Sequence, residues 1–362
     1  MRVAPRVTPR VNSPKSPNVG VVTRRIWTLI VALVPILAFL GLLSSVTVPF
    51  VALGPGPTFD TLGEVDGKKV VDIKPAEDVH PTSGHLNMTT VSQSDGLSMG
   101  QALALWLSGR EQLVPRDLVY PPDKSKDDVD TENTKDFKSS EDNAEYAALG
   151  YLKYPKAVTV QTVSDPGPSV GKLQDGDAID LVNNKPVANL DEFTAILKST
   201  KPGDQLIIDY RRKGGDIGTT TITLGKNPDR DYGFLGVGVV DAPWADMTID
   251  FNLANIGGPS AGLMFSLAVV DKLTTGDLND GKFVAGTGTI TSDGKVGPIG
   301  GITHKMLAAQ EAGATIFLVP AENCADAKSA RDIDLQLIKV ETLNQAVDAL
   351  HDVSAGREPP SC

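Results

Sequence analysis

A serine set in a glycine-rich turn is the residue of this sequence best placed to act as a nucleophile. Ser260 lies in the stretch Gly-Gly-Pro-Ser-Ala-Gly at 257–262, between strand-like residues 247–253 and an almost wholly apolar run at 261–270. A run that is apolar on all sides predicts a buried helix, and the first turn of a helix has unpaired backbone N–H groups. Those groups could stabilise the oxyanion that forms when Ser260 attacks a carbonyl. The same pattern also fits a serine that only caps a helix.

A serine nucleophile needs a base, and a histidine is the first candidate. Gly258, Ser260 and Gly262 match the Gly-x-Ser-x-Gly turn of α/β-hydrolases, in which an acid and then a histidine follow the serine. His351 does follow, but no acid–histidine context accompanies it, and we expect it on the exposed face of the last helix. An α/β-hydrolase-type esterase that depends on His351 is therefore an alternative.

Lys305 is the second candidate base. It follows Gly-Pro-Ile-Gly-Gly-Ile-Thr-His at 297–304 and begins a helix predicted over 305–312, with Ile302 and Met306 as apolar neighbours. A free lysine has a pKa of about 10.4, so a lysine that acts as a base near pH 8 needs that pKa lowered by about 2–3 through desolvation. Without an apolar pocket, Lys305 would be an ordinary exposed lysine.

The two motifs that contain these residues stand in a recognisable order. Gly-Pro-Ser-Ala-Gly at 258–262 is followed by Pro-Ile-Gly-Gly-Ile-x-x-Lys at 298–305. Together they resemble the proteolytic domain of Lon-type serine peptidases, and the resemblance extends over residues 245–350. It implies that Ser260 is the nucleophile and that Lys305 is the general base.

The resemblance also implies roles for neighbouring residues. Thr287, in Ala-Gly-Thr-Gly-Thr-Ile, would hydrogen-bond the lysine amine and orient it, and Gly258, Pro259 and Ala261 would support the serine turn. Lon enzymes that use ATP usually have an aspartate where this chain has Gly257. That departure puts in doubt a carboxylate that helps to position the serine, but not the serine and lysine themselves.

A second domain is predicted over residues 156–225. Leu-Gln-Asp-Gly-Asp-Ala-Ile at 173–179 leads into a strand that ends at an Asn-Asn turn, and an amphipathic helix at 190–197 and two alternating strands follow. This order resembles a bacterial PDZ domain. The resemblance implies that an extended peptide, usually the C-terminal tail of a protein, is captured by strand addition beside the helix. A small β-rich domain that serves only as a spacer is the alternative.

An uncharged stretch of 23 residues at 26–48 predicts a transmembrane helix. Its helical length is about 34 Å, enough to cross a hydrocarbon core of roughly 30 Å. Residues 1–48 carry six basic and no acidic side chains, so we expect a cytoplasmic tail at 1–25 and everything after the span outside the cytoplasm. The lipid bilayer is thus a predicted partner. A cleaved signal peptide is the alternative, although its apolar region is normally about 7–15 residues.

The membrane-proximal region at 49–155 is expected to pack on the proteolytic domain. Within it, 12 of the 21 residues at 122–142 are charged, which predicts a solvated loop. Its aspartates lack the glycine that an EF-hand calcium loop requires. The formal net charge of −11 divides into +6 up to residue 48 and −17 beyond it, which argues against nucleic-acid binding.

Together these features predict an α+β multidomain chain with a single N-terminal transmembrane helix, a PDZ-like β-rich domain and a Lon-type α/β proteolytic domain at 230–352. The arrangement resembles bacterial membrane-anchored PDZ-containing Lon-like serine proteases. The sequence has neither a Gly-x4-Gly-Lys-[Ser/Thr] loop nor His-Glu-x-x-His, so we expect no ATP, other cofactor or metal. The predicted function is ATP-independent endopeptidase cleavage of flexible or misfolded segments of extracytoplasmic or membrane-associated proteins.

Three questions stay open at this point. A non-catalytic, membrane-tethered PDZ scaffold is an alternative from a different class of protein. A homo-oligomer is compatible with the resemblance, because Lon-type domains often form rings. The two cysteines, Cys324 and Cys362, are compatible with one disulfide bond or with two free thiols.

Overall fold

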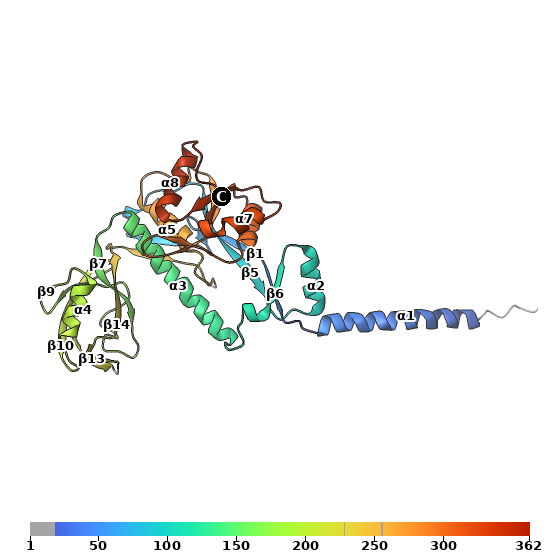
Figure 1. Ribbon diagram of the computed structural model, residues 1–362, viewed down its shortest axis with the longest axis horizontal. Helices are drawn as coiled ribbons and strands as arrows, with labels where there is room; N and C mark the ends of the chain where they lie inside the picture. The colour runs from blue at the N-terminus through green and yellow to red at the C-terminus, as the bar shows by residue number, and fades with distance from the viewer. Residues whose placement is uncertain (1–18, 228, 255) are drawn as a thin grey trace, which may run out of the picture.

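The computed structural model describes residues 19–227, 229–254 and 256–362 (Figure 1). Most of the tail predicted at 1–25 lies outside these residues. The first element, α1 (Val19–Ser45), projects from the rest of the chain as one long helix (Figure 1). Its segment Ile26–Ser45 is long and apolar enough to span a membrane, a test that a signal sequence near the N-terminus would also pass.

A mixed six-stranded sheet forms the centre of the larger domain. Four neighbouring strands pair in parallel, and the remaining two continue the sheet in antiparallel pairing. Half of the strands come from the first third of the chain, so the membrane-proximal region predicted only to pack on the proteolytic domain contributes to the same sheet. In order across the sheet the strands are β20 (Gln336–Val340), β19 (Ile316–Pro320), β16 (Phe283–Gly286), β5 (His85–Ser94), β1 (Phe50–Asp60) and β6 (Gln112–Pro115).

Helices cover both faces of this sheet. Successive residues of a strand point to opposite faces, and here both faces have apolar side chains that need to be buried. Leu318 enters a core shared with α5 (Gly262–Leu273) and α8 (Leu343–Ser354), whereas Phe317 and Val319 enter a core shared with α6 (Ile302–Ala312). Helix α5 is buried over almost its whole length, as its apolar sequence predicts.

The stretch predicted to be a solvated loop at 122–142 is mostly exposed up to residue 136, but from Lys126 onward it is a helix, so the prediction of a loop is wrong there. Helix α3 (Lys126–Tyr151) begins with a capping box between Ser125 and Asp128, which satisfies free N–H groups at its start. Its later half is buried against α5, where Phe137, Ala144 and Ala148 repeat at helical spacing. Phe137 is the only aromatic residue at 122–142, so the composition of this stretch does not reveal the buried face of the helix.

The second sheet, with its own apolar core, forms the smaller domain (Figure 1). Helix α4 (Leu190–Lys198) packs on it and contacts its last strand. The sheet extends to Pro243, beyond the predicted boundary at residue 225 and into the range predicted for the proteolytic domain. Its strands in order are β11 (Asp216–Thr223), β10 (Gln205–Arg212), β8 (Ala178–Val182), β7 (Lys156–Val163) and β14 (Val237–Pro243), with β9 (Lys185–Pro186) beside β8.

Shorter elements connect these parts. Helix α2 (Met99–Ser108) lies next to the end of α1 (Figure 1). The remaining elements are β2 (Glu64–Val65), β3 (Lys68–Lys69), β4 (Val71–Lys74), η1 (Ala76–Asp78), η2 (Arg116–Leu118), β12 (Gly225–Asn227), β13 (Arg230–Phe234), β15 (Thr248–Phe251), β17 (Thr289–Ile290), β18 (Val296–Gly297), η3 (Ala321–Asn323) and α7 (Cys324–Ser329).

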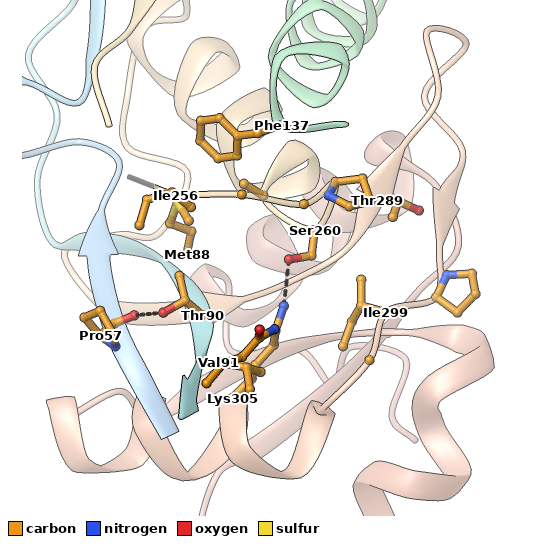
Figure 2. A pocket seen from close by; sticks show the side chains of 17 residues that line it. Pro57, Met88, Thr90, Val91, Phe137, Ile256, Ser260, Thr289, Ile299 and Lys305 are labelled. Carbon is orange, nitrogen blue, oxygen red and sulfur yellow. Dashed lines mark hydrogen bonds between the residues drawn. The ribbon is translucent and has the colours of Figure 1, made fainter. Parts of the chain in front are cut away.

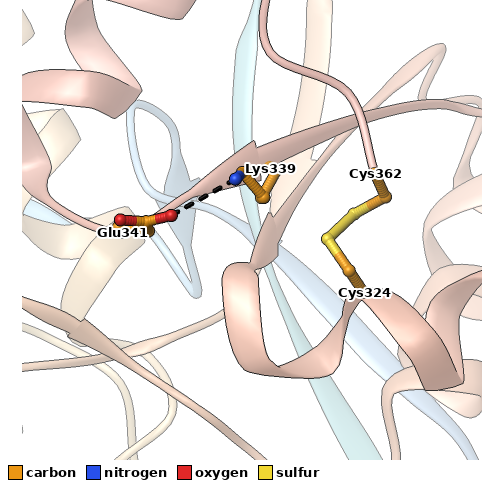
Figure 3. The surroundings of a disulfide bond; sticks show 4 residues. All are labelled: Cys324, Lys339, Glu341 and Cys362. Carbon is orange, nitrogen blue, oxygen red and sulfur yellow. Dashed lines mark ion pairs between the residues drawn. A yellow bond between two sulfur atoms is a disulfide. The ribbon is translucent and has the colours of Figure 1, made fainter.

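The two cysteines form a disulfide bond (Figure 3). Cys324 begins α7 and Cys362 is the last residue of the sequence, and their Cα atoms are 5.3 Å apart. The bond fixes the C-terminal segment beside β20, where Ser361 pairs with Ile338. Both cysteines pack against the core that α6 and α7 cover.

Candidate active site

The turn that carries Ser260 lies immediately before the buried helix α5. Gly258 adopts the left-handed backbone conformation, with φ at +85°, which a residue with a side chain rarely adopts. Ser260 itself is half-buried, two residues before the first residue of α5. The carbonyl of Ser260 accepts a hydrogen bond from the backbone N–H of Gly288, which fixes the turn against the segment after β16.

Lys305 reaches this turn from the first turn of α6. Its Nζ lies 2.7 Å from Ser260 Oγ and 2.9 Å from Thr287 Oγ1 (Figure 2). The lysine side chain is only 3% exposed. The fold thus brings together two residues that are 45 positions apart in the chain.

Burial lowers the pKa of Lys305 from its usual 10.5 to about 8. Desolvation penalises the ammonium form, and no acid near the amine opposes this effect. Among the described residues, Lys305 forms no ion pair with a carboxylate. A neutral amine is therefore accessible near pH 8, which is what a lysine base requires.

Thr287 connects the lysine to the serine turn. It follows the last residue of β16, at the carboxyl end of a central strand, and its side chain is fully buried. Its Oγ1 accepts a hydrogen bond from Lys305 Nζ and donates one, at 3.2 Å, to the carbonyl of Ser260. One hydroxyl therefore fixes both the amine and the backbone of the turn.

The backbone N–H groups of Ser260 and of the residue after it are available beside the serine hydroxyl. In the part of the chain that the structure describes, the backbone N–H groups of Ser260 and Ala261 have no protein acceptor. The N–H of Gly258 is not free, because it donates at 2.8 Å to the carbonyl of Asn133 on α3. The Pro259 carbonyl accepts a hydrogen bond from a side chain of α3. An oxyanion can thus be stabilised by Ser260 and Ala261, but not by Gly258 in this conformation.

Helix α3 supplies site residues that the sequence did not reveal. Asn133 holds Gly258, and Ser140 Oγ donates at 3.0 Å to the carbonyl of Pro259. Between them, Phe137 packs edge-on against Phe265 of α5, with ring centroids 5.8 Å apart. The signal that could have found this helix is the single phenylalanine in a charged stretch, followed at helical spacing by alanines.

Helix α3 approaches the backbone closely at Gly257. A Cβ atom on Gly257 would lie 3.0 Å from the Cβ of Asn133, closer than nine in ten real Cβ contacts. A side chain at position 257 would therefore require Asn133 of α3 to move by a few tenths of an ångström. In this chain α3, rather than a carboxylate, holds the turn.

A cavity of about 630 Å³ opens beside Ser260 (Figure 2). Apart from Lys305 its lining is uncharged, so it suits an uncharged group. Figure 2 shows Phe137 and Ile256 on one side of Ser260 and Ile299 on the other. The lining residues are Pro57, Met88, Thr90, Val91, Gln93, Phe137, Ile256, Gly257, Gly258, Pro259, Ser260, Ala261, Thr289, Pro298, Ile299, Gly300 and Lys305.

His351 does not take part in this site. It is exposed on α8 and lines a different cavity, together with Tyr151 and Thr274. The structure therefore gives no support to the esterase alternative, which requires His351 near Ser260.

Residues 254–352 match the model of the Lon protease (S16) C-terminal proteolytic domain. The chain carries a Lon-type proteolytic domain. Lon protease of Roseiflexus castenholzii is 42% identical over 87 residues, which are 23% of this chain and 11% of the relative. Lon protease 1 of Herpetosiphon aurantiacus is 39% identical over 107 residues, which are 29% of this chain and 13% of the relative. This chain thus spans little more than a tenth of those relatives.

Residues 129–224 match the model of the PDZ domain. That match begins within α3 and ends before β14, whereas the sheet that contains β7 also includes β14. Among solved structures, the PDZ domain of an SdrC-like protein from Listeria monocytogenes is 27% identical, with 23% of this chain and 87% of that chain covered and a TM-score of 0.22. The chain therefore combines a PDZ domain and a Lon-type domain, and the PDZ assignment rests on the family match.

Proposed function

We propose that this chain is a membrane-anchored serine endopeptidase in which Ser260 and Lys305 form the catalytic dyad. The observation that carries the proposal is the 2.7 Å approach of a buried lysine amine, with a pKa of about 8, to a serine hydroxyl. The match to a Lon protease domain supports peptide bonds as the substrate.

In the proposed mechanism, neutral Lys305 takes the proton of Ser260 as Oγ attacks the peptide carbonyl carbon. The N–H groups of Ser260 and Ala261 stabilise the oxyanion. The lysine ammonium then protonates the leaving amine as the C–N bond breaks. Water next attacks the acyl ester with Lys305 as base, and the ammonium returns its proton to Ser260 Oγ. Throughout this cycle Thr287 orients the amine.

The proposed topology places α1 across the membrane with both folded domains outside the cytoplasm. The basic residues before the apolar segment Ile26–Ser45 of α1, and the absence of charged residues within that segment, support this orientation. The Cys324–Cys362 bond supports it independently, because disulfides persist in oxidising compartments. ATP is scarce there, so we propose that the enzyme acts without ATP on segments that are already flexible.

The PDZ domain is proposed to bind a substrate tail. Strand β14 ends the sheet and contacts α4, an arrangement that allows an extended peptide to add beside β14. Such binding would raise the local concentration of the scissile segment near Ser260.

The proposal is tested with the purified full chain in nanodiscs and an unfolded fluorogenic reporter protein, with and without ATP. We expect cleavage that is indifferent to ATP and that falls by at least about 10²-fold in Ser260→Ala and Lys305→Ala. His351→Ala is the matched control and should retain activity. Full activity in Lys305→Ala would reject the dyad, and dependence on His351 would favour the esterase. Comparing membrane and secreted proteomes of cells with active protein or Ser260→Ala would then identify substrates.

A further inference from the structure

Helix α2 has an exposed apolar face. Met99, Leu103, Trp106 and Leu107 recur at i, i+4, i+7 and i+8, which places them on one side of the helix. Their side chains are between 39% and 69% exposed. The side of the helix next to this face packs through Ala102 and Leu105 on the start of β1 and on β6. An isolated exposed leucine needs no explanation, but four large apolar side chains on one face indicate a contact surface.

The position of α2 beside the end of α1 identifies what this face meets. The Met99 N–H donates at 2.8 Å to the carbonyl of Val46, and Ser98 pairs with Thr47. Gly100 lies so close to Leu43 that a Cβ there would be 3.3 Å from its carbonyl oxygen. Figure 1 shows α2 running across the direction of α1. If α1 crosses a bilayer, α2 lies along the bilayer surface.

The composition and capping of α2 suit that position. Residues 98–109 contain no charged side chain. Ser98 and Gln101 form a capping box, and Gly109 ends the helix in the left-handed conformation, so the helix ends are satisfied internally. The first charge after it, Arg110, is paired with Glu311 of α6 and is thereby held to the folded domain.

The apolar surface continues beyond the helix itself. A largely apolar hollow of about 700 Å³ lies between α2 and the start of β1, lined by Val48, Phe50 and Trp106 among others. Leu118, on the neighbouring turn η2, is 75% exposed. Tryptophan is enriched at the boundary between lipid headgroups and acyl chains, where its ring is apolar and its N–H is hydrated.

We propose that α2 is an interfacial helix whose Met99, Leu103, Trp106 and Leu107 insert into the outer surface of the bilayer. This inference rests on the membrane anchoring in the proposed function and extends it. Helix α1 tethers the chain, whereas α2 fixes the orientation of the folded domain on the membrane.

The contact also sets the height of the active site above the membrane. Strand β1 runs from Phe50, beside α2, to Pro57 at the cavity that holds Ser260. Seven residues of strand cover about 23 Å. The proposed substrates are therefore polypeptide segments that emerge from the membrane or lie just above it.

The test uses full chains with one tryptophan each, reconstituted in vesicles whose phosphatidylcholine is brominated near the headgroup end of the acyl chains. Trp27, Trp106 and Trp244 are the three tryptophans of the sequence, and two of them are changed to phenylalanine in each variant. We expect lipid bromine to quench Trp106, and not Trp244, which is buried near the PDZ domain.

The possible results distinguish failure of the interfacial helix α2 from failure of the transmembrane anchor α1. Quenching of Trp27 without quenching of Trp106 would overturn the interfacial helix and leave the anchor standing. A Trp106 that is shielded from water but unquenched by lipid would indicate a protein partner or a second copy, and would also overturn the proposal. Quenching of neither Trp27 nor Trp106 would overturn both membrane contacts.

A second measurement tests the consequence for substrates. Trp106→Ser with Leu107→Ser should lower, several-fold, the cleavage of a membrane-tethered reporter cut close to its anchor, and leave cleavage of a soluble unfolded reporter unchanged. Ile217→Ser is the matched control, because Ile217 is 82% exposed on β11 of the PDZ domain. Equal losses on both reporters, or no loss on the tethered one, would contradict the proposed positioning.

Discussion

Lys305 is a group whose burial costs stability while it enables the proposed chemistry. A pKa of about 8 in the folded chain, against 10.5 for a free lysine, corresponds to about 3 kcal/mol that disfavours the charged form. The unfolded chain binds this proton more tightly, so the penalty is fully present below pH 8. It shrinks as the pH rises from about 8 to 10.5.

Replacing Lys305 by methionine should therefore stabilise the fold and abolish activity. Methionine keeps most of the apolar volume and removes the buried charge, so we expect a gain of up to about 3 kcal/mol at pH 7. Thermal unfolding followed by circular dichroism measures it. Ser260→Ala is the control, because it should lose activity without this gain. A lower melting temperature for Lys305→Met would mean that the amine contributes to stability.

Thr287 is expected to act as a positioning residue. Thr287→Val removes the acceptor for Lys305 and the donor to the Ser260 carbonyl, and the peptidase rate should fall about tenfold. Thr287→Ser should restore most of it. Because the base is unchanged, the midpoint of the rise in rate with pH should stay near 8 while the plateau falls. If the plateau of the rate in Thr287→Val equals that of the wild-type chain, Thr287 does not position the lysine.

At the scale of elements, the sequence predicts the local parts better than their assembly. The helix α5, with its continuous apolar run, and the glycine turns around Ser260 and Lys305 have strong local signals. Helix α3 does not, because its first half is charged and only contact with α5 buries the second half. The pairing of β5 with β16 joins segments almost 200 residues apart, and no local pattern predicts it.

The contact between α3 and the serine turn predicts the effect of a small substitution. Gly257→Ala adds a Cβ 3.0 Å from that of Asn133 and should destabilise the fold by about 1–3 kcal/mol through overpacking. It should also displace the turn and lower the peptidase rate. In Gly300→Ala the added Cβ meets no atom within 4 Å, so its melting temperature should be unchanged. Equal melting temperatures for both variants would show that α3 does not hold the turn.

At the scale of the whole molecule, the described chain begins with a long apolar helix and ends in a segment fixed by a disulfide bond. The disulfide closes a separation of 38 residues and joins α7 to the C-terminal segment that pairs with β20. The spacing of the cysteines does not predict this bond, because the C-terminal residue comes near α7 only after the chain has passed through β20 and α8. The order of apolar N-terminal helix, PDZ domain and proteolytic domain is readable from sequence, whereas the sheet shared by the membrane-proximal region and the proteolytic domain is not.

Removing the disulfide should lower the stability of the proteolytic domain. Cys324→Ser with Cys362→Ser opens the loop that the disulfide closes over a separation of 38 residues. In the chain-entropy description the free energy of unfolding should fall by about 3–4 kcal/mol. Thermal unfolding with and without reductant measures the effect. Reductant should destabilise the wild-type chain and leave the double variant unchanged. If the wild-type chain is indifferent to reductant, the bond does not form in solution or does not stabilise the fold.

The most direct measurement of the proposed dyad is the rate at which a fluorophosphonate labels Ser260, followed by mass spectrometry of the full chain in nanodiscs over a range of pH. The rate should rise with pH, with a midpoint near 8, because only neutral Lys305 can take the serine proton. The rise should disappear in Lys305→Met. Labelling of Ser260 at the wild-type rate in Lys305→Met, or a rate without a step near pH 8, would contradict the dyad.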